Sequence, residues 1–231
     1  MKKVDHKTSK RFLEAKKQID AEKVYSVEEA IALIKETSTT KFDASVEIHV
    51  NLGVDIKKSD QQVRSSVSLP HGTGKNVIVA VMTPDSDKQK AAKEAGADII
   101  GEKDLIEEIK KGKINFDVIV ATPDAMKELA PAAKVLGPRG LMPNPKDGTV
   151  TQNVAEIVSK LKKGQVNYKN DDSGNLHSII GKASFGADQL KENYDTLIES
   201  IKKAKPQTSK GVYIRNISLS SAMGPGIKVL I

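Results

Sequence analysis

The sequence predicts two domains of different α/β class: an α+β domain formed by both ends of the chain, and a parallel α/β domain inserted into it. Strands that alternate polar and apolar residues occur near both ends, a pattern typical of antiparallel sheets with one exposed face. In the middle, short apolar strands alternate with helices, which indicates βαβ units. We place domain I at 1–72 and 165–231 and domain II at 73–164, with a hinge at Gly72 and Gly164.

The N-terminal segment of domain I is predicted to start with a polar, basic helix over 2–23. A second helix follows a capping box, in which Ser26 caps the helix and Glu29 lies three residues further on. The next strand, 42–52, has apolar residues at even positions and polar residues at odd positions, so we expect one buried and one exposed face. A short strand is expected near 63–69.

Domain II is predicted to be a small parallel sheet with helices on both faces. Its strands are almost wholly apolar, as expected for strands that are buried on two sides. A loop rich in Gly and Pro precedes the last helix. The predicted elements, in order, are a strand at 77–82, a helix at 87–95, a strand at 98–100, a helix at 103–111, a strand at 116–121, a helix at 124–135, the Gly/Pro loop at 136–148 and a helix at 153–163.

The C-terminal segment returns to the strands of domain I. A polar turn joins a first pair of strands, and a long helix that Pro206 ends separates them from a second pair. The predicted elements are a strand at 166–168, the turn at 169–174, a strand at 176–183, a helix at 187–205, and strands at 211–220 and 227–231.

The charge and composition favour a folded polyanion as the partner. Lys and Arg number 37 against 30 Asp and Glu, which gives a net charge of +7. With four Phe, four Tyr and no Trp, the chain is poorly equipped to stack successive single-stranded bases, so a folded RNA gripped through phosphates and sugars is favoured. The absence of cysteine excludes disulfides and thiolate metal sites. The longest apolar run, 77–82, is too short to cross a membrane, and we expect a soluble, cytoplasmic protein with no membrane partner.

No enzyme motif in the sequence is complete, and we predict no catalytic residue, metal site or cofactor. The segment Gly72–Lys75 looks like part of a phosphate loop, but Leu69 and Asn76 stand where that motif needs Gly and Ser or Thr. No metal-binding spacing links the four histidines, which are His6, His49, His71 and His177. The alternative that the residues leave open is an enzyme or small-ligand binder that closes on a cleft between the domains, near Gly72 and Arg139.

Three segments combine polar side chains with features suited to folded RNA. The exposed face of strand 42–52 offers donors and acceptors to the 2′-hydroxyls and base edges of a wide, shallow minor groove. The turns at 169–177 and 221–226 contain glycines that let the backbone approach a sugar-phosphate strand. Each segment also has a plain structural interpretation, as a solvent face or an ordinary turn, and residue types alone favour it for the strand. The candidate RNA-binding residues are Lys41, Phe42, Ser45, Glu47, His49, Lys169, Asn170, Asp171, Ser173, Gly174, His177, Ser221, Met223, Gly224 and Pro225.

Five stretches of the chain resemble the bacterial family of the large-subunit ribosomal protein L-one. They are 41–47, 67–75, 135–145, 175–185 and 223–226; they occur in the family's order, and the Gly/Pro block at 135–145 is highly specific. The resemblance implies a split ferredoxin-like α+β domain with an inserted Rossmann-like α/β domain. It also implies a monomer within the large ribosomal subunit that binds the stalk helices of the ribosomal RNA, assists the release of deacylated tRNA from the exit site, and represses translation of its own operon by binding its mRNA.

The resemblance places the family's RNA surface on Phe42, Ser45 and Glu47 and on the two turns described above. The Gly/Pro loop is expected to be structural or a secondary contact. One position departs from the family, which usually has Thr where this chain has Ala222. A hydroxyl that would bond to the RNA is therefore absent, and the loss of one neutral hydrogen bond costs about 0.5–1.5 kcal/mol.

Overall fold

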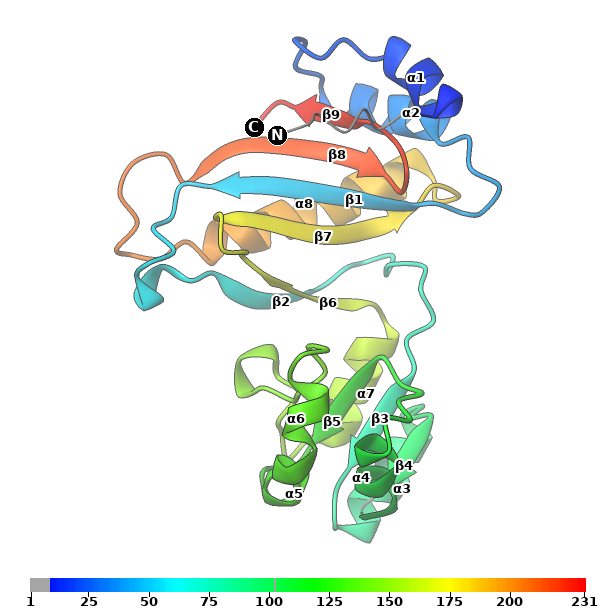
Figure 1. Ribbon diagram of the computed structural model, residues 1–231, viewed down its shortest axis with the longest axis vertical. Coiled ribbons are helices and arrows are strands. Elements are labelled where there is room, and N and C mark those ends of the chain that lie inside the picture. Colours follow the sequence, from blue (N-terminus) through cyan, green and yellow to red (C-terminus); the bar gives the residue numbers. More distant parts are fainter. Residues whose placement is uncertain (1–8, 102) are drawn as a thin grey trace, which may run out of the picture. The chain divides into compact units, whose positions relative to one another are not determined.

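The computed structural model describes residues 9–101 and 103–231, which form two compact units (Figure 1). The first unit contains the chain up to Val63 together with Leu69–Gly74 and Tyr168–Ile231. The second unit contains Arg64–Ser68 and Lys75–Asn167. The fold class predicted from the sequence is confirmed, because the first unit holds an antiparallel sheet and the second a parallel one.

The exact domain limits predicted from the sequence, and the hinge at Gly72 and Gly164, remain predictions. Gly72 and Gly164 each adopt a positive φ, of 66° and 96°, a region that favours glycine. Each also closes a local turn, since Gly72 N donates to the carbonyl of Leu69 and Gly164 N to that of Leu161. Both positions are therefore turns.

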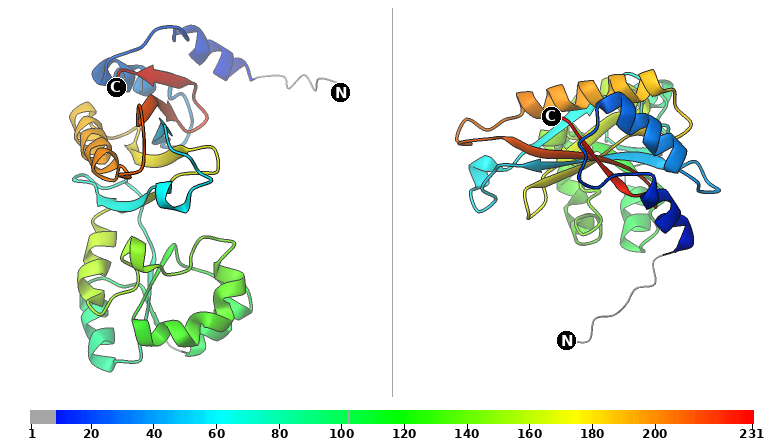
Figure 2. Two further views of the ribbon diagram at one scale, coloured as in Figure 1. Left: turned by 90° about the vertical axis from the view of Figure 1, so that its left-hand side faces the viewer. Right: turned by 90° about the horizontal axis from the view of Figure 1, so that it is seen from above.

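The first unit is built on a four-stranded antiparallel sheet in the order β7-β1-β8-β9. The even residues of β1 are buried and its odd residues are half-buried, as the alternation predicted. Helices α2 and α8 pack on the apolar face, and both views in Figure 2 place them on one side of the sheet. The strands are β1 (Ser45–Leu52), β7 (Asn175–Lys182), β8 (Ile214–Ser221) and β9 (Gly226–Val229).

The helices of the first unit are fixed by their ends. The capping box of α2 is present: Ser26 Oγ accepts from Glu29 N at 3.2 Å, and the Glu29 carboxylate accepts from Ser26 N at 3.1 Å. The predicted helix over 2–23 is shorter in the described residues, ending at Lys17, and its residues 2–8 lie outside them. The helices are α1 (Lys10–Lys17), α2 (Val27–Thr37) and α8 (Ala187–Lys203).

The second unit is a three-stranded parallel sheet in the order β4-β3-β5, with helices on both faces. One apolar cluster joins α3 and α7 to Val79, Val81 and Val120, and another joins α4, α5 and α6 to Met82 and Ile119. The strands are β3 (Val79–Met82), β4 (Ile99–Gly101) and β5 (Val118–Ala121); the helices are α3 (Ser86–Glu94), α4 (Lys103–Lys110), α5 (Pro123–Leu129), α6 (Ala133–Leu136) and α7 (Val154–Lys162).

One predicted helix of the second unit, at 124–135, is divided in the structure. A 3₁₀ turn at Ala130–Ala132 separates α5 from α6. The break follows from Pro131, which has no N–H to donate and whose ring clashes with the preceding turn of a helix. The remaining strands, β2 (Arg64–Ser68) and β6 (Gln165–Lys169), form a two-stranded sheet.

The Gly/Pro loop is anchored by a charged pair. The carboxylate of the buried Asp147 accepts from Arg64 Nε at 2.7 Å and from a second nitrogen of the same guanidinium. Two parallel contacts of this kind fix both the direction and the distance of the pair. The loop is therefore held to β2, which supports the structural role expected for it.

Candidate nucleic-acid interface

The face of the antiparallel sheet opposite α2 and α8 carries a continuous group of polar side chains. The strand register brings them together: His49 lies opposite both His177 of β7 and Ser218 of β8, and Glu47 lies opposite Ser220. All of them are half-buried or exposed. We call this group the polar sheet face; its members are Glu47, His49, Asn51, Asn175, His177, Ser218, Ser220 and Lys228.

A pair of histidines occupies the centre of the polar sheet face. The Nδ1 atoms of His49 and His177 are 2.7 Å apart, so one ring donates a proton and the other accepts it. His49 Nε2 lies 2.9 Å from Ser220 Oγ and 4.0 Å from the Glu47 carboxylate, and His177 Nε2 lies 3.6 Å from the Asp171 carboxylate. Partial burial, and then the neighbouring His177, lower the pKa of His49, and Glu47 opposes the shift. The pair therefore holds at most one positive charge while the two Nδ1 atoms remain in contact.

The turn between β6 and β7 is shaped by Asp171. Its carboxylate accepts the backbone N–H groups of Asn175 and Ser173 at 2.7 and 2.8 Å. These hydrogen bonds, above all the one from Asn175, lower the pKa of Asp171. The carboxylate thus stays ionised in the turn and holds its backbone in one conformation.

Of the other residues in this turn, some are buried and support its backbone, and others are exposed to solvent. Asn170 is buried: its side chain accepts from Val63 N at 2.8 Å and donates to the Asp171 carbonyl at 3.0 Å. Gly174 is buried as well, with φ of 78° and a carbonyl that accepts from Leu52 N at 2.9 Å. The exposed side chains of the turn are those of Lys169, Asp172, Ser173 and His177.

The turn between β8 and β9 projects Met223 into solvent, where 71 % of the residue is exposed. Met223 has φ of 63°, an uncommon conformation for a residue with a Cβ. Two hydrogen bonds fix the turn: the Arg11 guanidinium donates to the Met223 carbonyl at 3.0 Å, and Ala222 N donates to the Ser45 carbonyl at 2.8 Å. The turn is therefore tied to both α1 and β1.

Beneath Met223 the same turn is tightly packed. Gly224 N donates to the Ser221 carbonyl at 2.8 Å, and a Cβ on Gly224 would lie 2.2 Å from Ser221 Oγ, so a larger residue would require the Ser221 side chain to move. Ser221 and Pro225 are buried, and among the described residues the Ser221 hydroxyl has no hydrogen-bond partner. Of the candidates in this turn, Met223 and the backbone of Gly224 are thus the accessible ones.

The segment before β1 presents Lys41 and Phe42 as exposed side chains, with Phe42 55 % exposed. The sequence pattern had grouped Phe42 with the buried even residues, and that expectation is wrong because β1 begins only at Ser45. The Asp43 carboxylate holds the segment by accepting from Ser184 N and Oγ. Ser45 Oγ accepts from Lys182 Nζ at 2.9 Å.

The candidate residues thus lie along one surface but at two ends of it. Ser45 and Met223 mark one end of β1, and the turn at 169–175 meets the other end through Leu52 and Gly174. Asn51 lies six positions beyond Ser45 along β1, a length of about 20 Å. The histidine pair lies between the two ends.

Several polar residues of this surface escaped the sequence analysis. Ser218, Ser220 and Lys228 join it only through the register of β8 and β9, and Lys182 only through its bond to Ser45. Alternation in β8, where Ser218 and Ser220 flank the buried Leu219, was the available signal.

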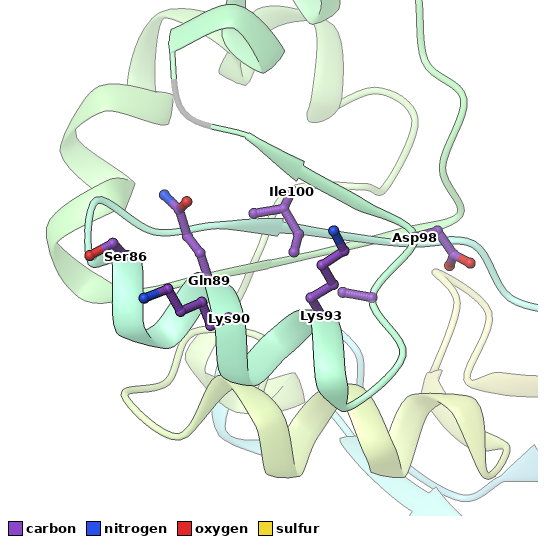
Figure 3. Close-up of a pocket in the computed structure, with 7 residues that line it drawn as sticks. Ser86, Gln89, Lys90, Lys93, Asp98 and Ile100 are labelled. Atoms are coloured by element: carbon purple, nitrogen blue, oxygen red, sulfur yellow. The ribbon is translucent and has the colours of Figure 1, made fainter.

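The second unit carries a separate, shallow depression beside α3 and β4 (Figure 3). Lys90 and Lys93 at its rim are exposed. The carboxylate of Asp98 accepts from Lys162 Nζ at 2.6 Å and from Val79 N at 2.7 Å, and these bonds, with Lys162 first, lower its pKa. Asp98 thus links α7 to β3 and is engaged in structure.

Two further findings limit the chemistry available in the described parts of the chain. Across residues 9–101 and 103–231, no three His, Asp or Glu side chains cluster as they would to hold a metal ion. In the same residues, no helix has the length and apolar character needed to span a membrane.

The fold and this surface define a class: a two-unit α/β protein whose antiparallel sheet leaves one polar face available to a partner. A family model described as the Ribosomal protein L1p/L10e family matches residues 34–225, and the chain belongs to this family. It is therefore a ribosomal protein that binds ribosomal RNA within the large subunit. The resemblance noted from the sequence is confirmed at the level of the family. Membership also favours a structural role over the alternative of an enzyme or small-ligand binder.

Proposed function

We propose that the polar sheet face, with the turns at its two ends, binds the stalk helices of the large-subunit ribosomal RNA. The observation that carries the proposal is the continuity of accessible polar groups from Ser45 to Asn175 along about 20 Å of sheet. The minor groove of an RNA helix is wide and shallow and lines its walls with 2′-hydroxyls, so a flat polar sheet reaches them without insertion.

Each part of the surface has a chemical role in this proposal. Glu47 accepts hydrogen bonds from 2′-hydroxyls or guanine amino groups, and the histidine pair both donates and accepts. The exposed Phe42 and Met223 pack against bases or sugars at one end. Lys169 faces the backbone phosphates at the other. Asn170, Gly174, Ser221 and Pro225 support the two turns from below.

We further propose that the same surface binds the mRNA of the protein's own operon and that the protein assists release of deacylated tRNA from the exit site. One surface cannot hold two RNAs at once, so ribosomal RNA and operon mRNA compete for it. Free protein then represses its own synthesis only when ribosomal RNA is saturated. In the ribosome the protein acts as a monomer in this proposal.

A competition titration tests the main proposal. A labelled stalk fragment bound to the protein is displaced by unlabelled stalk RNA or by an unrelated duplex of equal length, at two salt concentrations. We expect stalk RNA to compete better by at least a hundredfold, and this preference to persist at the higher salt. Equal competition by both RNAs, with binding that collapses at high salt, would leave only non-specific attraction of the +7 chain to phosphates.

A matched pair of variants locates the surface. Glu47→Gln removes a charge from the polar sheet face, and Glu199→Gln removes one from the exposed side of α8 on the opposite face of the sheet. We expect Glu47→Gln to weaken stalk binding about tenfold or more, since hydrogen bonds to charged groups contribute about 1.5–3 kcal/mol. Glu199→Gln should leave it unchanged. Equal effects of the two changes would place the RNA elsewhere.

A further inference from the structure

Helix α1 carries a basic face that the proposed RNA surface does not include. At 100° per residue, Arg11 and Ala15 share one side of the helix, and Lys10, Leu13, Glu14 and Lys17 share the other, with Lys16 next to Leu13 at its margin. Ala15 is buried and Arg11 half-buried, so the first side faces the protein. The second side faces solvent: Lys10 and Lys17 are exposed, and Leu13 is 47 % exposed.

The second observation is that α1 lies on the same side of the sheet as the polar sheet face. Both views in Figure 2 place α1 on the opposite side of the sheet from α8. That is the side of the polar sheet face, since α8 packs on the apolar one. An eight-residue helix is about 12 Å long, so α1 adds length to the surface beyond the β8–β9 turn.

The contact of Arg11 with the β8–β9 turn is the third observation. The guanidinium donates to the carbonyl of Met223 at 3.0 Å, across 212 residues of sequence. Met223 is itself one of the exposed residues of the proposed RNA surface. A partner that touches Met223 is therefore adjacent to α1, and Arg11 fixes the helix in that place.

The charge of α1 indicates the chemistry of that partner. The helix holds four basic residues, Lys10, Arg11, Lys16 and Lys17, and one acidic residue, Glu14. Lys16 and Lys17 lie in the last turn, where the helix dipole also favours positive charge and helps to hold the helix together. Exposed lysines beside a surface that binds a polyanion lower the free energy of the complex by releasing counterions from phosphates.

We propose that α1 is a second contact of the same RNA: Lys10, Lys16 and Lys17 bind phosphates next to the groove read by the polar sheet face, and Arg11 positions the helix. The proposal rests on the RNA surface proposed above. Its contribution is electrostatic and independent of base sequence, so it adds affinity to the specific contacts of the sheet. An acidic protein surface is the alternative occupant, and the experiment below separates the two.

The test compares two triple variants with equal change of charge. Lys10, Lys16 and Lys17 are replaced by Gln in one, and Lys202, Lys203 and Lys205, exposed at the end of α8, are replaced by Gln in the other. The dissociation constant for the stalk RNA is measured at three or more salt concentrations. Because each lost phosphate contact reduces the slope of log K against log salt by about 0.7–0.9, we expect the α1 variant to lose about 2 from the slope and at least tenfold in affinity. The α8 variant should keep the slope of the unmodified protein.

Two outcomes would overturn the proposal without touching the RNA surface of the sheet: identical slopes in the two triple variants, or a slope in the α1 variant equal to that of the unmodified protein. A failure of the RNA surface itself is seen separately, as absence of any preference for stalk RNA in the unmodified protein. Loss of folding is recognised because misfolded molecules lower the active fraction and leave the slope of the rest unchanged. Arg11→Gln is a further check: with the lysines intact, we expect it to weaken binding three- to tenfold.

Discussion

The two sheets of this molecule use their faces differently. In the parallel sheet, the consecutive residues Ile119 and Val120 are both buried, each in a different apolar cluster. In the antiparallel sheet, Ile48 is buried while the next residue, His49, belongs to the polar sheet face. A sheet covered on both faces leaves only its edges and loops to a partner, whereas a sheet covered on one face offers a flat surface. In this protein, the surface that we propose for RNA recognition is the sheet face whose polar residues need no apolar cover.

The largest effects that test this comparison are on stability. We expect Ile119→Ala to lower the free energy of unfolding by about 2–5 kcal/mol and Val120→Ala by about 1.5 kcal/mol or more, because each opens a cavity in its own cluster. Ser218→Ala, on the polar sheet face, should change it by about 0.5 kcal/mol or less. Urea unfolding followed by circular dichroism measures all three. If Val120→Ala left the free energy of unfolding unchanged, one face of the parallel sheet would not be packed.

The next effects are on RNA affinity, through the two exposed apolar side chains at one end of the surface. Phe42→Ala and Met223→Ala should each weaken the binding of stalk RNA. The lost stacking contact of Phe42 should cost about 1–3 kcal/mol of binding free energy, and the loss of Met223 should cost less. Leu230→Ala is the control, because Leu230 is similarly exposed, at 68 %, outside the surface. Unchanged binding by both variants, with the fold intact, would remove this end of the sheet from the interface.

Smaller effects concern pH and the histidine pair. A bound polyanion stabilises a protonated pair, so RNA binding takes up a proton and affinity rises as the pH falls. Because the pKa of His49 is lowered from its ordinary value, the rise should occur below about pH 6.5 and reach at most about tenfold per pH unit. Titrations at pH 7.5, 6.5 and 5.5 measure it, and His49→Gln, which removes the titrating group, should abolish it. The charged groups that face the pair are Glu47 and Asp171, and Lys228 lies on the same sheet face beyond Ser218.

The lowered pKa of His49 also affects the stability of the protein without RNA, and this effect of pH has the opposite direction. The unfolded chain binds this proton more tightly than the folded one, so the stability linked to His49 is fully present above about pH 6.5 and is lost as the pH falls towards the folded pKa. Urea midpoints between pH 7.5 and 5.5 should therefore decrease, and His49→Gln should remove that part of the decrease. A midpoint that rises on acidification would contradict the direction of the shift.

The smallest expected effect is at Ala222, where the resemblance noted from the sequence leads us to expect a threonine. Ala222→Thr introduces a hydroxyl at the β8–β9 turn, and we expect a gain of about 0.5–1.5 kcal/mol in the free energy of stalk binding if the hydroxyl reaches the RNA. Ala222→Val has nearly the same shape without the hydroxyl and serves as the control. Equal affinities for Thr and Val at this position would show that the hydroxyl has no RNA partner here.

Much of the fold was predictable because local patterns agree with it. The alternation in β1 gives the buried and exposed faces, and the Ser26–Glu29 capping box gives the start of α2. The division of the helix at 124–135 was also within reach, since Pro131 marks the break. Phe42 was misplaced because periodicity does not show where a strand begins.

The site was predictable residue by residue but not as an arrangement. His49 and His177 were both candidates, yet their contact depends on a register between strands 128 residues apart in sequence. The same holds for Arg11 and Met223, whose hydrogen bond joins a helix and a turn that no local pattern connects. Ser221 and Asn170 have residue types that suit RNA, and only the packing reveals that they are buried.

The strand order of the antiparallel sheet has a consequence for when this protein acquires its proposed RNA surface. β1 lies between β7 and β8, which are made much later in synthesis. At about 5–20 residues per second, roughly 10–30 s pass between the emergence of β1 and that of β8. During this interval the continuous segment Lys75–Asn167 is free to fold, while β1 has neither neighbour. A chain that stops before β7 therefore lacks the assembled polar sheet face, which is the surface that we propose binds the RNA.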